Sequence, residues 1–203
     1  MLRTALAPLT TFFLLLMALP AAQAASAPAD TVSAFHQALS EAMTRSAKLG
    51  CEGRIAKLGP AVDAAFDLPF IAERSLRRHW KNLDESQRQQ FTAALRTSVV
   101  ATYATEFSTP GSVTFSTGAT EPQSNGDALV RASLKPKDDA AVSLDYLLKP
   151  RGEHWQVVNV LADGVSDLAL RASQYDGLMK KEGLPALLAR LDSQTQQLLS
   201  RCK

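Results

Sequence analysis

The sequence has little cysteine and histidine, two residue types that many enzymes use for catalysis. Its 203 residues include only two cysteines and three histidines, His36, His79 and His154. None of these histidines has another metal-binding residue type at the spacing of a metal site. A glycine-rich phosphate loop and a Gly-x-Ser-x-Gly nucleophile elbow are also missing. We therefore predict no catalytic residue, no metal ion and no cofactor.

Long apolar runs are missing too, apart from a short one near the N-terminus. Arg3 precedes the apolar residues 12–19, and Ala22 and Ala24 offer the small side chains that signal peptidase reads. A membrane-spanning helix needs ~20 apolar residues, so this run is too short to cross a bilayer. We predict a signal peptide over residues 1–24, export to the periplasm, and a soluble mature chain of residues 25–203.

Neither sign of charge is in large excess. Lys and Arg together number 22 and Asp and Glu 20, so the net charge is +2 at pH 7. Removal of the predicted leader takes Arg3 away and leaves a mature chain at +1. Because the charges are interspersed along the chain, they are typical of a solvated surface and give no reason to expect nucleic acid as a partner.

The two cysteines, Cys51 and Cys202, lie near the start and at the end of the mature chain. In an oxidising compartment an even number of cysteines suggests a disulfide, which would tie an early helix to the C-terminus. Two free thiols are the alternative. Two thiols alone cannot complete a structural zinc site.

The period of the apolar residues changes twice along the chain, which predicts helices, then strands, then helices. Helical spacing favours helices over about 31–49, over 51–66 with a kink near Gly59 and Pro60, after an N-cap at Asp67, and after a capping box of Asp84 and Gln87. Two closing helices follow, the first capped by Ser166 and the second beginning near Pro185.

Between these helices the period becomes two. Apolar and polar residues alternate over residues 113–115, 128–134, 142–148 and 155–160, and turn residues separate these segments. This pattern predicts a four-stranded antiparallel sheet with one buried face. The predicted fold is therefore a single α+β domain in which five or six helices wrap the sheet.

One basic group stands out. Arg74, Arg77, Arg78 and Lys81 recur at intervals of three and four residues, which predicts one exposed helix face. A solvated surface is the simplest interpretation. The alternative is a docking surface for an acidic partner or for phosphate headgroups.

Eight short blocks along the chain form an ordered pattern. They are residues 66–72, 78–80, 84–91, 102–104, 155–160, 164–166, 174–175 and 182–188. In this order they resemble the signature of the MlaC/toluene-tolerance family of periplasmic phospholipid-binding carriers, over about residues 30–195. Residues 163–168 and 191–192 resemble the hopanoid-associated (HpnM) branch of that family.

The resemblance implies a lipid carrier. It implies an apolar cavity between sheet and helices that holds acyl chains while the headgroup stays largely in water. The cargo would be a phospholipid or a hopanoid, and the chain would be a monomer. Its partners would be an outer-membrane lipoprotein complex and an inner-membrane ABC transporter with MCE domains.

Nine apolar and aromatic residues are candidates for the lining of this cavity, with ordinary core packing as the alternative for each. Tyr103 and Tyr146 are the strongest of them, because a phenol can lie at a cavity mouth with its hydroxyl toward the headgroup. The candidates are Phe70, Ile71, Leu95, Val99, Tyr103, Phe107, Tyr146, Leu148 and Val158.

A small periplasmic enzyme that acts on an apolar substrate is the alternative from another class. Asp145, Asp163 or Asp167 could place a carboxylate near the sheet, where it would remove a proton next to a carbonyl, and His154 is a further candidate. Surface or capping roles explain the three carboxylates more simply. A periplasmic scaffold is a third hypothesis.

Overall fold

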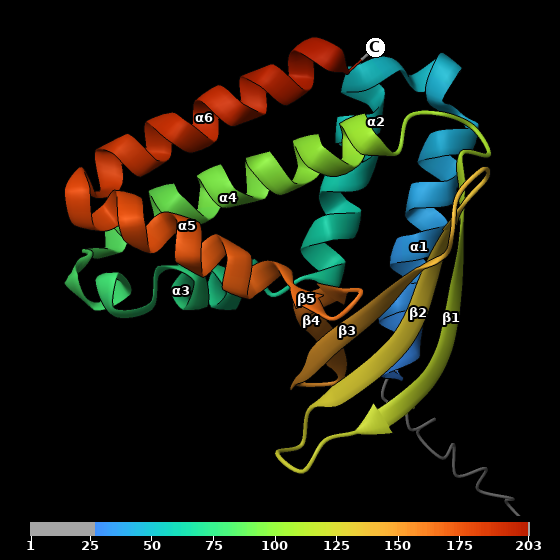
Figure 1. The fold of residues 1–203 in the computed structure, drawn as a ribbon, viewed down its shortest axis with the longest axis horizontal. Coiled ribbons are helices and arrows are strands. Elements are labelled where there is room, and N and C mark those ends of the chain that lie inside the picture. The colour runs from blue at the N-terminus through green and yellow to red at the C-terminus, as the bar shows by residue number, and fades with distance from the viewer. Residues whose placement is uncertain (1–26, 203) are drawn as a thin grey trace, which may run out of the picture.

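The computed structural model describes residues 27–202, so the predicted signal peptide lies outside the described residues. The chain follows the predicted order of helices, strands and helices (Figure 1). The first half contains α1 (Pro28–Thr44), α2 (Ser46–Ala65), α3 (Leu68–Leu76), the short 3-10 helix η1 (Arg77–Asn82) and α4 (Glu85–Glu106). The strands are β1 (Val113–Pro122), β2 (Ala128–Pro136), β3 (Val142–Arg151), β4 (His154–Ala162) and β5 (Val165–Ser166), and α5 (Asp167–Lys181) and α6 (Gly183–Arg201) follow.

The sheet is antiparallel, as predicted, but it has five strands in the order β1-β2-β3-β4-β5. The prediction of four strands is wrong because β5 has only two residues, Val165 and Ser166, which pair with Ala162 and Leu161. Two residues are too few to show an alternating pattern. β5 covers part of the free edge of β4, and a parallel bridge between Phe66 and Val157 covers another part.

The predicted helix starts of α3, α4 and α5 are confirmed. The Asp67 carboxylate accepts a hydrogen bond from the Phe70 amide at 3.0 Å. Asp84 and Gln87 form the reciprocal capping box that begins α4. The Ser166 hydroxyl accepts from the amide of Ala169, three residues into α5.

The break between the first two helices differs from the prediction. α1 ends at Thr44 rather than near residue 49, and the non-helical backbone within α2 lies at Gly50, whose φ is +61°. Pro60 lies inside α2 without such a break. Gly50 allows the left-handed conformation at little steric cost, so the chain bends there.

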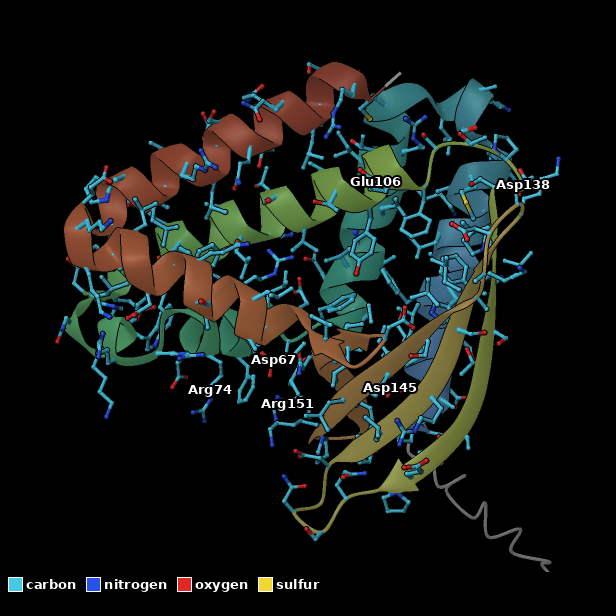
Figure 2. The ribbon with its side chains drawn as sticks, in the orientation of Figure 1. Asp67, Arg74, Glu106, Asp138, Asp145 and Arg151 are labelled. Atoms are coloured by element: carbon cyan, nitrogen blue, oxygen red, sulfur yellow. A yellow bond between two sulfur atoms is a disulfide. The ribbon has the colours of Figure 1, made fainter. Side chains whose placement is uncertain are left out.

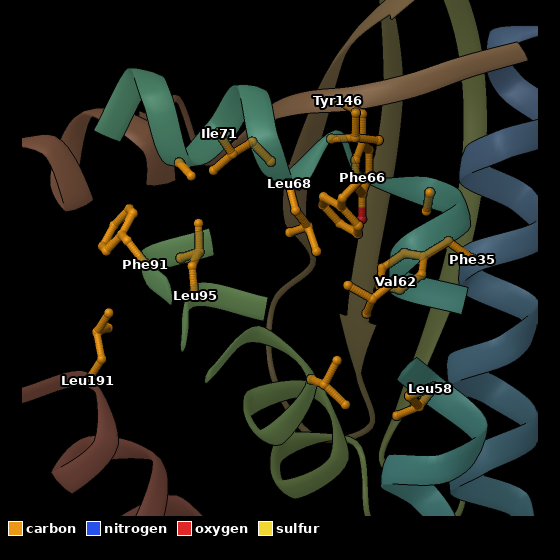
Figure 3. Close-up of a cluster of buried hydrophobic side chains, with 14 of the residues drawn as sticks. Phe35, Leu58, Val62, Phe66, Leu68, Ile71, Phe91, Leu95, Tyr146 and Leu191 are labelled. Carbon is orange, nitrogen blue, oxygen red and sulfur yellow. The ribbon is translucent and has the colours of Figure 1, made fainter. Parts of the chain in front are cut away.

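The helices form two groups around the sheet (Figure 1). α1 packs along β1, β2 and β4, while α3, α4, α5 and α6 form a layer beside the sheet, in which α4 packs on α6 and α3 on α5. Phe66 and Leu68, at the junction of α2 and α3, lie between these groups in one apolar core (Figure 3). Both residues line a cavity between the helix layer and β4.

A disulfide closes the fold at its far end. Cys51 in α2 and Cys202 after α6 are bonded, with Cα atoms 5.4 Å apart. Beside them Arg54 is 1% exposed, and its Nε donates to the Ala104 carbonyl at 2.8 Å, near the end of α4. A cation at a helix C-terminus interacts favourably with the helix dipole. The covalent bond and Arg54 therefore join α2, α4 and α6 at one place.

Candidate functional site

A cavity of about 230 Å³, called the central cavity below, lies between α3, α4, β4 and α5. Most of its wall is aliphatic or aromatic, and its polar residues include a group around the start of α5. The lining residues are Phe66, Leu68, Ile71, Val99, Thr102, Tyr103, Val158, Asn159, Val160, Asp167, Leu168 and Arg171.

A β-bulge in β4 helps to shape this wall. Leu147 pairs with Asn159 and Leu148 pairs with Val157, so Val158 has no opposite residue on β3. Both Val157 and Val158 are buried. Because an extra residue in one strand bends it and changes the direction of a side chain, β4 can bury two successive valines. Val158 thereby lines the central cavity.

The polar residues of the cavity form a compact network at the start of α5. The Asp167 carboxylate accepts from Nε of Arg171 at 2.7 Å, and the Asn159 Oδ1 accepts from the Ser166 hydroxyl and the Leu168 amide. Burial alone lowers the pKa of Arg171, but Asp167 and Tyr175 raise it above its ordinary value. Arg171 therefore stays charged, and Asp167 compensates its charge.

Aromatic rings separate the central cavity from two neighbouring hollows. Phe66 and Leu68 also line a groove of about 730 Å³ along α4, and Phe35 lines a pocket of about 560 Å³ beside α1 and α2. The ring centroids of Phe35 and Phe66 are 5.0 Å apart, and Tyr103 contacts both rings. Side-chain rotation of Phe66 would change the wall between the central cavity and the larger groove.

The structure brings four of the nine predicted lining residues, Ile71, Val99, Tyr103 and Val158, together around the central cavity. The other five lie elsewhere. Leu95 and Leu148 are fully buried in the core, and Tyr146 is buried against α1. Phe107 packs between Tyr103 and Phe115 at the end of α4, and Phe70 lies on another side of α3. Contact of any of the nine with lipid stays a prediction.

The ring of Phe70 lies among cationic side chains and does not line the central cavity. The charged groups of Arg74, Lys149 and Arg151 lie 5.1, 5.8 and 5.7 Å from the centre of its ring. Arg151 is also paired with the N-cap Asp67. Figure 2 shows Asp67, Arg74 and Arg151 on the same side of the molecule. The sequence shows that Phe70 is hydrophobic, but it does not show that Phe70 belongs to a charged surface where α3 meets β3.

The predicted basic helix face is wrong in its geometry. α3 ends at Leu76, and Arg77 has a φ of +50°, so the chain continues as the separate 3-10 helix η1. Arg74, Arg77, Arg78 and Lys81 are all exposed. Arg78 is paired with Asp176 of α5 at 3.0 Å. The interval of three and four residues gave no sign of this break.

Of the four residues of the enzyme alternative, Asp167 lines the central cavity and the other three do not. His154 lies at the start of β4, whereas Asp163 and Asp167 follow its end. Asp145 is paired with Arg131, at 2.5 Å, and Asp163 accepts from the Ser143 amide. Residues 27–202 contain no group of His, Cys, Asp or Glu side chains that could hold a metal ion.

Two polar groups of interest were not predicted. The first is His36, which is 5% exposed and whose Nε2 lies 2.9 Å from the Tyr146 hydroxyl. The second is the pair Asn159 and Arg171, which line the central cavity. A buried histidine on a helix and a polar residue in a strand give no distinct pattern in the sequence. Only the antiparallel register brings β4 against the start of α5.

Within residues 27–202, no helix has both the length and the apolar character that a membrane crossing requires. The α+β fold, with an apolar cavity between the sheet and the layer of α3, α4 and α5, defines the class of small α+β proteins with an internal apolar site.

The comparisons identify the family. The family model described as "MlaC protein" matches residues 33–193, and the chain belongs to this family. The fold is also that of a phospholipid-binding protein from Ralstonia solanacearum, solved in complex with a phospholipid. The TM-score is 0.72 at 19% identity, over 86% of this chain and 99% of that one.

Proposed function

We propose that this chain is a periplasmic lipid carrier. It binds the apolar part of a phospholipid or of a hopanoid-type lipid in the central cavity and shuttles the lipid between an outer-membrane lipoprotein complex and an inner-membrane MCE-type ABC transporter. The observation that carries this proposal is an apolar cavity with polar residues at the start of α5, in a chain of the MlaC family.

Simple energetics agree with a carrier that has no catalytic group. Transfer of a methylene from water to an apolar cavity is worth ~0.8 kcal/mol, so two acyl chains of ordinary length contribute some 20 kcal/mol or more. Bound lipid is therefore not released into water to any appreciable extent. A bilayer offers the chains nearly the same environment as the cavity, so transfer at a docked membrane complex is close to isoenergetic.

The cavity must widen to accept acyl chains. Its volume of about 230 Å³ is below the ~300–1,000 Å³ of common small-molecule sites. Phe66 and Leu68 line both this cavity and the larger groove along α4. We propose that movement of these two side chains joins the two spaces when lipid enters.

A bulky residue at Val99 tests the assignment of the cavity. Val99→Trp should lower the amount of co-purified lipid several-fold, because the indole fills space that the chains need. The measurement is mass spectrometry of lipid extracted from freshly purified protein, normalised to protein. Thr97→Trp is the matched control, since Thr97 has a similar size and lies on the exposed side of the same helix.

The control should keep the lipid content of the wild type, and both variants should keep the circular dichroism spectrum of the wild type. Equal lipid content in a folded Val99→Trp variant would contradict the cavity assignment. Absence of lipid from the wild type in repeated preparations would contradict the carrier function itself.

The basic surface at the end of α3, formed by Arg74, Arg77 and Lys81, supports docking to acidic groups at membranes. Changing these three residues to Glu should slow lipid transfer to vesicles that contain phosphatidylglycerol several-fold at low salt, because electrostatic attraction raises association rates. The control changes Arg45, Lys48 and Lys137 to Glu and has the same net charge. Equal transfer rates in the two triple variants would argue against docking through this surface.

A further inference from the structure

Two polar groups on the wall of the central cavity have no hydrogen-bond partner within residues 27–202: the Tyr103 hydroxyl and the Nδ2 amide group of Asn159. The Asn159 side chain is held in place, because its Oδ1 accepts from both the Ser166 hydroxyl and the Leu168 amide. In the same range, no side-chain nitrogen or oxygen that is sealed from solvent lacks a partner. The two free groups therefore reach open space on residues that line the cavity.

Both groups are neutral hydrogen-bond donors. Burial raises the pKa of Tyr103 well above its ordinary value, with a further contribution from the charge of Asp167, so the phenol stays protonated. The amide has no charge at any pH. The nearby ion pair of Asp167 and Arg171 is self-compensated. This part of the cavity therefore offers donors without a net positive charge.

Neutral donors on an apolar wall select for neutral acceptors in the cargo. Acyl chains that fill the cavity displace water, and a donor left without an acceptor then loses its hydrogen bonds to solvent. Net positive charge would favour a phosphate, whereas donors beside a compensated ion pair suit carbonyl oxygens. In an acyl lipid, ester carbonyls lie where the chains join the polar part of the molecule.

We propose that the central cavity recognises lipids whose chains are attached through ester bonds, and that Tyr103 and Asn159 donate hydrogen bonds to the ester carbonyl oxygens. This inference rests on the proposed lipid-binding function and names the cargo class of the same cavity. It excludes lipids without a carbonyl at this position as preferred cargo, among them ether-linked lipids with the same chains and headgroup.

The test compares two lipids that differ only in the linkage. Delipidated full-length mature protein is titrated with the diester and the diether forms of a phosphatidylcholine with identical saturated chains, each in competition with a fluorescent fatty acid. The wild type should bind the diester roughly 5- to 30-fold more tightly, the ratio that about 1–2 kcal/mol from one or two neutral hydrogen bonds gives. Equal affinities in the wild type would overturn the inference while leaving the carrier function intact.

Two conservative variants locate the preference. Tyr103→Phe removes one donor and keeps the ring, and Asn159→Asp removes the other while an oxygen still accepts from Ser166 and Leu168. Each should lower the diester preference, and the double variant should abolish it. Thr97→Val is the control, because it removes a hydroxyl from the exposed side of the helix that carries Tyr103, so the preference should stay unchanged.

A wild-type preference that both cavity variants keep in full would overturn the assignment to Tyr103 and Asn159. If neither lipid displaces the fluorescent probe from the wild type, the proposed carrier function fails, and the inference fails with it. The affinity ratio of the wild type decides the question of the linkage even if a variant does not fold.

Discussion

Replacement of both Cys51 and Cys202 by serine should lower the free energy of unfolding by about 5 kcal/mol. The disulfide joins residues 151 positions apart, so it closes a loop that contains most of the described chain. In the chain-entropy model, a loop of this size restricts the unfolded ensemble by about 5 kcal/mol at 25 °C. Since small domains are stable by only about 5–15 kcal/mol, the double variant should be close to the limit of folding.

Urea denaturation of the wild type and the double variant, followed by circular dichroism, measures this effect. The wild type in a strong reductant is the matched control, because reduction removes the bond without replacing a side chain. The serine variant and the reduced wild type should lose a similar amount of free energy of unfolding. A large loss in the serine variant alone would instead assign the effect to local packing beside Arg54, whose Nη2 lies 3.4 Å from Sγ of Cys202. A change below about 1 kcal/mol in both samples would contradict the entropic argument.

The general fold could be predicted because its signals are local. The caps at Asp67, Asp84 and Ser166 each act within three residues of the chain, and the change of period from 3.6 to 2 marks the sheet. β5 could not be predicted in this way, since its two residues become a strand only by pairing with β4. The break at Arg77 could not be predicted either, since no glycine or proline marks it.

The site could be predicted only in part, because apolar character does not distinguish a cavity wall from a filled core. Val99 and Leu95 lie one helical turn apart in α4, yet Val99 lines the central cavity and Leu95 is completely buried. Asn159 lines the cavity because a bulge precedes it and the start of α5 returns to its side chain. Such placements depend on register and on long-range packing rather than on a motif.

Acidification should destabilise the protein through His36. Its ring is stacked on Phe115, with centroids 4.5 Å apart, and its two nitrogens lie near the hydroxyls of Tyr146 and Thr117. Burial lowers the pKa of His36 from 6.5 to about 4. The folded state therefore binds a proton less readily than the unfolded state, in which the pKa is close to 6.5.

The sign of the effect follows from this difference. Above pH 6.5 the imidazole is neutral in both states, and its full contribution to stability is present. As the pH falls from 6.5 toward 4, the unfolded state takes up the proton first, so the free energy of unfolding decreases. With a pKa of about 4 in the folded state and 6.5 in the unfolded state, the free energy of unfolding falls by about 2 kcal/mol by pH 5 and by about 3 kcal/mol by pH 4.

His36→Gln isolates this contribution, because glutamine keeps polar contacts near Tyr146 and Thr117 but does not titrate. The variant should be less stable than the wild type at pH 7, and the difference should shrink by about 2 kcal/mol at pH 5, as measured by urea denaturation at both values. His154→Gln is the matched control, since it makes the same substitution at an exposed position. Carboxylates elsewhere titrate in both proteins, so their effects cancel in the comparison. If the free energies of unfolding of the wild type and His36→Gln change with pH in parallel, His36 is not held neutral between α1 and the sheet.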